Sequence, residues 1–118
     1  MTEYVRKKDS RESVEVTAGQ GTTMQVLISS EDAPNFAFRK FVMEPHGGMP
    51  KHTNLVEHEQ YVLQGSGIIE IGGEVFEVSA GDAVYIPGNV SHSYKAGKDG
   101  FEFICVVPNK EDKIEIVE

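Results

Sequence analysis

Two of the chain's four histidines lie in one short stretch, "HTNLVEHEQYVLQG", which begins at His52. His52 and His58 are six residues apart, and Asn54 stands between them. If this segment is extended, residues two apart point to the same side, so His52 and Asn54 face one way together. A third histidine, His92, follows 34 residues after His58 and also opens a strand-like run. Three neutral imidazoles that converge from separate strands could bind a first-row transition metal and leave positions open for a substrate.

The elements that must position these histidines are predicted to be strands. Short β-rich runs such as "TTMQVLIS", "FAFRKFVME" and "FEFICVVP" are separated by turn residues about every ten positions, which is typical of an all-β sandwich or barrel. In "GIIEIGGEVFEV", the pair Gly72-Gly73 predicts a tight hairpin turn, because glycine accepts positive φ angles. Neighbouring strands of a small barrel lie about 5 Å apart, close enough to bring the histidines together.

Length and composition predict one domain, residues 1–118, with a core over about 13–108 and loosely held ends. The formal net charge of −8 disfavours nucleic acid and anionic membrane surfaces as partners. The single cysteine, Cys105, excludes an intramolecular disulfide and suits a reducing compartment. No stretch has the apolar length of a signal peptide or a membrane span, so we expect a cytoplasmic location and no membrane partner.

The histidine stretch resembles the first motif of the cupin superfamily, in its small single-domain group. That motif runs Gly, five residues, His-x-His, three or four residues, Glu, six residues, Gly. His52, Asn54, His58 and Gly65 occupy the corresponding places, so two ligand positions depart from the pattern. His46 stands where the motif has its leading glycine and is predicted to be a loop residue.

A second stretch, "GDAVYIPGNVSH", resembles the second cupin motif. It matches at Gly81, Pro87 and His92, although the motif's second glycine is displaced to Gly88 and Ala96 stands in place of the closing Asn. The two motifs together imply an all-β double-stranded β-helix, the cupin or jelly-roll barrel.

The resemblance also implies a metal site formed by His52, His58 and His92. His58 stands where the family usually has its Glu, and some small cupins are similar in using histidine there. Glu59 would need the longer spacing and points the other way by strand alternation, so we expect it at the surface. Asn54 is left open as a fourth ligand, since its oxygen could ligate, hold a water or only form hydrogen bonds. The expected cofactor is one divalent transition metal: Mn, Fe, Ni or Zn.

Residues outside the motifs suggest a substrate pocket. The apolar alternation of Phe36 to Met43 slips at Arg39, which indicates either a bulge or a charged side chain turned inward. Arg39 is therefore a candidate contact for an anionic substrate, with an ordinary surface arginine as the alternative. Cys105 is predicted to be core or pocket wall, and Tyr61 and Tyr85 to pack in the core. The face that Cys105 occupies also carries Phe101, Phe103 and Val107.

Three kinds of function remain open. The first is a metal-dependent oxidoreductase, dioxygenase-like, acting on a small organic substrate. The second is a metal-dependent isomerase or lyase acting on a small polar compound. The third is a non-catalytic small-molecule-binding cupin in which Asn54 marks a decayed site. Resemblance to small cupins also implies a homodimer, which continuous apolar runs such as "FICVV" favour.

Overall fold

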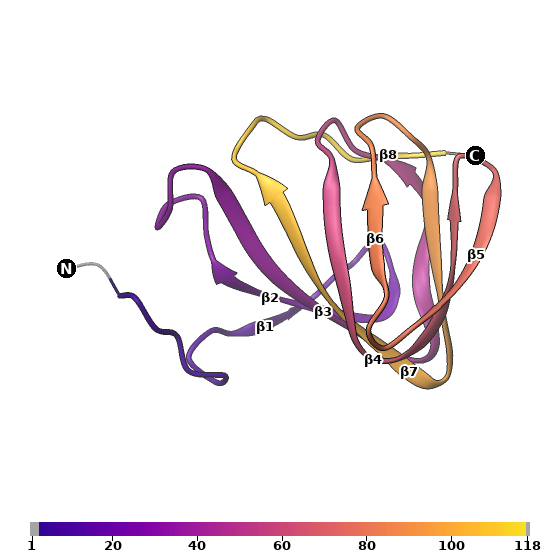
Figure 1. The fold of residues 1–118 in the computed structure, drawn as a ribbon, viewed down its shortest axis with the longest axis horizontal. Helices are drawn as coiled ribbons and strands as arrows, with labels where there is room; N and C mark the ends of the chain where they lie inside the picture. Colours follow the sequence, from indigo (N-terminus) through magenta and orange to yellow (C-terminus); the bar gives the residue numbers. More distant parts are fainter. Residues whose placement is uncertain (1–2, 118) are drawn as a thin grey trace.

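The computed structural model describes residues 3–117 and consists of strands joined by turns (Figure 1). The strands are β1 (Ser13–Glu15), β2 (Gln20–Ile28), β3 (Phe36–Thr53), β4 (His58–Ile71), β5 (Glu74–Ser79), β6 (Ala83–Ile86), β7 (His92–Pro108) and β8 (Glu115–Ile116). All pairings are antiparallel. The described residues contain no helix, and hence none that could span a membrane. The all-β prediction is confirmed.

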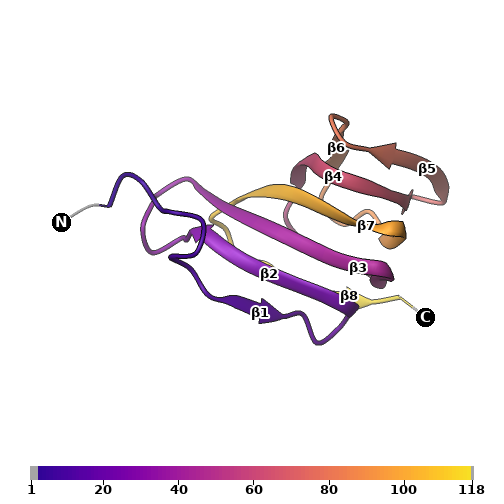
Figure 2. The same ribbon diagram turned by 90° about the horizontal axis from the view of Figure 1, so that it is seen from below.

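All of these strands belong to one sheet that folds over itself. Their order is β1-β2-β3-β7-β4-β5, with β6 paired to β4 and β8 paired to β3. Figure 2 shows β1, β2 and β3 on one side and β4, β5 and β6 on the other, with β7 between them. The long strands β3, β4 and β7 carry register shifts between Met43 and Gly48 and between Val62 and Gly67. Such irregularities bend a strand, so each long strand contributes to both sides of the predicted double-stranded β-helix.

Glycines occupy the positions where the chain turns most sharply. Gly72 and Gly73 have φ angles of 58° and 89° and join β4 to β5, with Ile71 paired to Glu74. This is the predicted hairpin. At Gly65, φ is 79°, and an added Cβ would collide with the carbonyl oxygen of Gly100 on β7. The last residue of the first motif is therefore a glycine because two backbones meet there.

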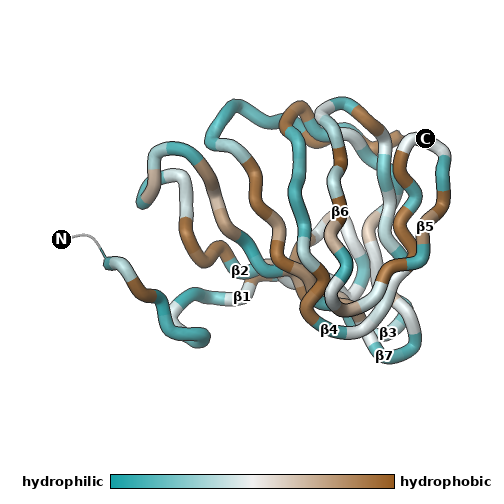
Figure 3. Tube along the Cα trace, viewed as in Figure 1, coloured by the Kyte–Doolittle hydropathy of each residue, from teal (hydrophilic) through white to brown (hydrophobic). Residues whose placement is uncertain are grey.

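Side chains alternate between the interior and the surface along much of each long strand. Hydrophobic and hydrophilic segments accordingly follow one another along the chain trace (Figure 3). On β7 the interior side carries the predicted set of Phe101, Phe103, Cys105 and Val107, all buried. Tyr61 and Tyr85 were predicted to pack in the core, and this is wrong: they are 52% and 59% exposed. Each lies between two inward-facing neighbours on its strand, so alternation places both tyrosines outside.

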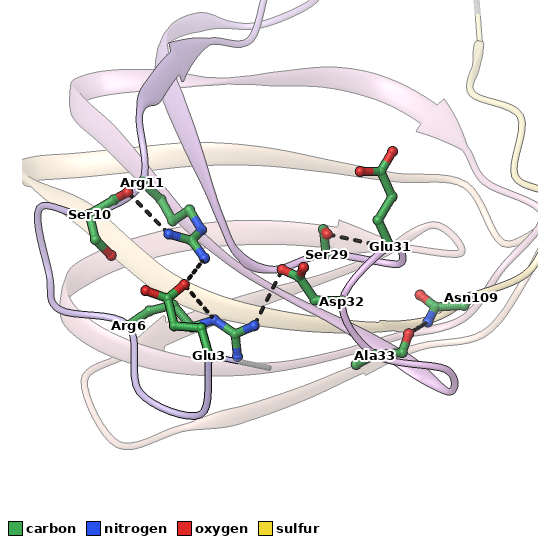
Figure 4. Close-up of polar contacts among 9 residues, drawn as sticks. All are labelled: Glu3, Arg6, Ser10, Arg11, Ser29, Glu31, Asp32, Ala33 and Asn109. Atoms are coloured by element: carbon green, nitrogen blue, oxygen red, sulfur yellow. Dashed lines mark hydrogen bonds and ion pairs between the residues drawn. The ribbon is translucent and has the colours of Figure 1, made fainter. Parts of the chain in front are cut away.

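The described residues near both chain ends, where the sequence predicts loosely held segments, make specific contacts. In the N-terminal segment, Arg11 lies 2.6 Å from Glu3, and Arg6 lies 3.4 Å from Asp32, at the end of the turn after β2 (Figure 4). After β7, the Asn109 side chain donates a hydrogen bond to the carbonyl oxygen of Ala33 (2.6 Å). The chain then returns to pair β8 with the end of β3, beside His52.

Candidate metal and ligand-binding site

A cavity of about 330 Å³ lies inside the folded sheet. Its wall comes from β1, β2, β3, β4 and β7, from the segments between β1 and β2 and between β3 and β4, and from the C-terminal segment before β8. Most of the wall is apolar, and a set of polar side chains also lines it. These are Glu15, Thr17, Arg39, His52, Asn54, His58, Gln60, His92, Tyr94 and Asp112. An apolar cavity with few convergent polar groups is typical of small-molecule sites.

The three histidines of the predicted metal site come together at this cavity. His52 near the end of β3 is paired in register with His92 at the start of β7, and their ring centroids are 4.2 Å apart. His58, the first residue of β4, has its ring centroid 5.7 Å from that of His92. All three are buried, with exposed fractions of 5%, 6% and 1% for His52, His58 and His92. Residues far apart in the sequence are thus neighbours because three bent strands share one end.

Backbone contacts determine which nitrogen of two rings is free. The Nδ1 atom of His52 lies 2.7 Å from the carbonyl oxygen of Pro50, and that of His92 lies 3.0 Å from the oxygen of Val90. Because a carbonyl oxygen only accepts, Nδ1 carries the proton in each neutral ring and Nε2 keeps its lone pair. Metal-binding histidines are commonly held in this tautomer by such a contact.

The electrostatic surroundings of His58 and His92 favour their neutral forms. Burial lowers the pKa of His58 to about 4, and the positive charge of Arg39 and the neighbouring His92 add to the effect. Burial also lowers the pKa of His92, against the opposing hydrogen bond to Val90. A neutral imidazole is the form that ligates a transition metal, so the donor set suits such an ion.

Whether these residues can bind a metal depends on the chemistry of their donor atoms and on how closely those atoms converge. Within residues 3–117, no three or more His, Cys, Asp or Glu side chains already form a coordination sphere. The buried Nδ1 of His58, however, has no hydrogen-bond partner. A buried nitrogen left unpaired is costly, and a ligand at this ring would relieve the cost. The donor atoms of the three histidines therefore suit a divalent transition metal. Their side chains are not arranged as a complete coordination sphere in this structure.

Asn54 is engaged with the C-terminal segment. It is buried, and its side-chain nitrogen donates to the Asp112 carboxylate at 3.0 Å. The same carboxylate accepts hydrogen bonds from the backbone nitrogens of Leu55 (2.8 Å) and Val56 (3.3 Å). Partial burial raises the pKa of Asp112, but backbone hydrogen bonds and the Asn54 contact outweigh it and lower the pKa. Asn54 thus holds a structural contact through nitrogen, and only its oxygen is left as a possible fourth ligand.

The remaining candidate residues fall into two groups, those that line the cavity and those that do not. Arg39 and Cys105 line the cavity, and the inward-turned alternative for Arg39 is the one observed. Glu59 is exposed, as predicted. His46 was predicted to lie in a loop but falls within the irregular stretch of β3, exposed and with a φ of 63°. It does not line this cavity.

Sequence reasoning missed five polar residues of the cavity: Glu15, Thr17, Gln60, Tyr94 and Asp112. Gln60 is buried and donates to the hydroxyl oxygen of Tyr94 at 2.6 Å. Strand alternation could have found both, because Gln60 lies two residues from His58 on β4 and Tyr94 two from His92 on β7. Asp112 carries no such signal, since it reaches the cavity only because the C-terminal segment folds back.

Comparison with known proteins places the chain among cupins. The sequence model of the Cupin domain family matches residues 39–107. The polyketide cyclase RemF from Streptomyces resistomycificus is similar over 100% of this chain and 87% of its own, with 30% identity and a TM-score of 0.89. A cupin-2 domain from Rhodospirillum rubrum covers 98% of this chain and 81% of its own at 24% identity, with a TM-score of 0.85.

One curated protein shares a short stretch. The dimethylsulfoniopropionate lyase DddW of Ruegeria pomeroyi is 49% identical over 41 residues. This stretch is 35% of the present chain, and it spans only 27% of the lyase.

Proposed function

The chain belongs to the cupin domain family, and from that premise we propose that it is a metal-dependent enzyme acting on a small organic molecule inside its cavity. His52, His58 and His92 would hold one divalent transition metal. The observation that carries the proposal is the convergence of three buried rings, two of which are held with Nε2 free.

A bound ion of this kind would act as a Lewis acid that polarises an oxygen of the substrate. The chain's own residues do the rest. The Pro50 and Val90 carbonyls fix the tautomer and orientation of His52 and His92. The aromatic side chains Phe41, Tyr94 and Phe103 line the cavity and exclude water. Exclusion of water strengthens the electrostatic interactions made inside the cavity.

Tyr94 is a candidate for holding a proton near the substrate. Burial raises the pKa of its phenol, which therefore stays protonated at neutral pH. Since its oxygen already accepts a hydrogen bond from Gln60, the hydroxyl hydrogen is free to donate elsewhere. A protonated hydroxyl on the residue that packs edge-on against His92 could orient a substrate oxygen at the metal.

Two reaction classes compete. The sequence alone ranks a dioxygenase-like oxidoreductase first, because the three predicted ligands include no carboxylate. Similarity to a polyketide cyclase over the whole chain, and to a lyase over a short stretch, supports a non-oxidative cyclase or lyase reaction instead. We therefore rank the non-oxidative reaction first and the oxidative one second.

The metal site is tested by elemental analysis of untagged protein purified without chelator. We expect near one equivalent of Mn, Fe, Ni or Zn in the parent, and loss of that metal in His58→Ala and in His92→Ala. The matched control is His46→Ala, which removes an exposed histidine outside the cavity and should keep the metal. A parent that stays metal-free after reloading would overturn the proposal, as would equal metal content in all variants.

Oxygen dependence separates the two reaction classes. Metal-loaded protein is given enolic, phenolic and diketone compounds with and without dioxygen. Equal turnover in both conditions supports the cyclase or lyase reaction. Turnover that stops without dioxygen, with consumption of the gas, supports the oxidoreductase.

A further inference from the structure

Arg39 is a half-buried cation in the wall of the cavity. Among the described residues that line the cavity, it is the one lysine or arginine. Its position on β3 is paired with Cys105 on β7, and Cys105 is paired with Gln60 on β4. The three side chains therefore form a transverse row of polar groups inside the sheet. Gln60 is two residues from His58, which places this row next to the histidines.

No anionic side chain among residues 3–117 balances the charge of Arg39. Its buried Nε forms no hydrogen bond, and one terminal nitrogen donates only to the Cys105 sulfur at 3.4 Å. Burial raises the pKa of Cys105, so the sulfur is a neutral thiol and a weak acceptor. In the part of the chain that the structure describes, no carboxylate forms an ion pair with Arg39.

Two carboxylates, Glu15 and Asp112, also line the cavity. Glu15 is exposed and forms no ion pair with Arg39, and Asp112 accepts hydrogen bonds from Asn54, Leu55 and Val56 instead. A guanidinium that is partly withdrawn from water without a counterion loses hydration that no carboxylate replaces. A positive charge left free inside an apolar cavity is therefore a binding position for an anion that comes from outside.

The wall beside Arg39 suits a flat apolar body. The guanidinium carbon lies 5.2 Å from the centroid of the Phe41 ring. Phe41 is stacked on Phe103 at 5.2 Å, and Phe103 is stacked on Tyr94 at 5.3 Å. Three nearly parallel rings thus lead from the cation toward His92, whose ring meets Tyr94 edge-on at 5.8 Å. Aromatic faces bind planar apolar groups well.

We propose that the cavity takes a planar organic anion, with its carboxylate or enolate oxygen on Arg39 and its apolar body along Phe41, Phe103 and Tyr94. The inference deepens the function proposed above and rests on it for the identity of the cavity as the substrate site. Arg39 forks two N–H donors toward one oxyanion, which makes it a specificity-determining contact.

The test uses metal-free protein, so that binding to an ion does not contribute. Untagged protein is treated with chelator, and its affinity for 2-naphthoate and for the neutral 2-naphthamide is measured by calorimetry and by NMR titration. We expect the carboxylate to bind about 10- to 100-fold more tightly, as a charge-assisted hydrogen bond at a buried site provides. Arg39→Met should abolish this preference, and Arg39→Lys should keep part of it.

Lys40 supplies the matched control. It neighbours Arg39 on β3, does not line the cavity, and pairs with Glu102 at 3.4 Å. Lys40→Met should bind 2-naphthoate like the parent. Equal affinity for acid and amide in the parent would overturn the proposal, as would binding of neither or an unchanged preference in Arg39→Met. The acid and amide comparison in the parent does not depend on any variant folding.

The outcomes also separate this inference from the proposed function. If the protein prefers the carboxylate but contains no metal in the elemental analysis, the anion subsite is supported and the metal-dependent enzyme is contradicted. If the histidines bind a metal but the protein shows no preference for the carboxylate, the metal site is supported and the anion subsite is contradicted.

Discussion

Both faces of β3, β7 and β4 differ from those of an ordinary sheet. The inward face carries polar side chains, among them Arg39, Gln60 and His58, between its apolar ones. The outward face exposes large apolar side chains, such as Phe38 and Tyr61. Buried polar groups are costly, and large apolar patches are uncommon on a monomer. From this difference we expect the inside to bind a ligand and the outside to contact another protein surface.

Register shows how continuous the outward face is. Phe38 on β3 is paired with Val106 on β7, and Val106 is paired with Glu59 on β4. Tyr85 on β6 lies opposite Glu59 and continues the row. Three of the four residues in this row are therefore apolar, and the fourth, on β4, is Glu59. The neighbouring row contains Lys40, Ile104 and Tyr61, so charges of both signs are present.

The largest contrast between the faces should be in stability. Phe103 is 2% exposed, and Phe103→Ala should lower the free energy of unfolding by about 3–5 kcal/mol because it leaves a cavity in the core. Phe36 on the same sheet is 60% exposed, and Phe36→Ala should cost less than about 1 kcal/mol. Urea denaturation of both variants measures the difference. Similar losses in both would break the distinction between the two faces.

A smaller effect is expected where the surface meets the cavity. Asp112→Ala removes the acceptor that holds the Asn54–Val56 segment, and we expect a loss of about 1–2 kcal/mol of unfolding free energy. The C-terminal segment should also open more often, so that trypsin cleaves faster after Lys110 or Lys113.

The neighbouring acidic residue provides the control for Asp112. Glu111 is exposed, and Glu111→Ala should leave both stability and cleavage rate unchanged. If Asp112→Ala behaves like Glu111→Ala, the contact between the C-terminal segment and Asn54 does not hold the cavity wall.

The outward face predicts a homodimer of this chain. A twofold interface on this face would bury Tyr61 of both copies and could pair Lys40 of one with Glu59 of the other. Tyr61→Glu should weaken dimerisation at least about tenfold, since it places a charge in an apolar contact. Analytical ultracentrifugation measures the dissociation constant. Val75→Glu on β5, 64% exposed, is the control and should leave it unchanged. A monomeric parent at high concentration would contradict the prediction.

Much of this fold could be predicted because its signals are local. Gly72-Gly73 and the alternation of "FEFICVV" depend on neighbouring residues, and both were confirmed. Tyr61 and Tyr85 were misplaced because a tyrosine in a strand has no preferred face. Their exposure follows only from which neighbours point inward.

The site was harder to predict because it depends on contacts between distant segments. The motif spacing indicated His52, His58 and His92, and the structure brings them together. That they bind a metal stays a prediction. Asp112 could not be found from sequence, because its contact with Asn54 spans 58 residues. The direction of Arg39 was left open, and only the register of β3 against β7 resolves it.

The most direct test of a ligand-organised interior is anomalous diffraction from crystals of the untagged protein reloaded with zinc, measured on both sides of the zinc absorption edge. The account predicts one anomalous peak inside the cavity, about 2.0–2.1 Å from a ring nitrogen of each of His52, His58 and His92. A peak only at a surface residue such as His46, or no peak at all, would contradict it.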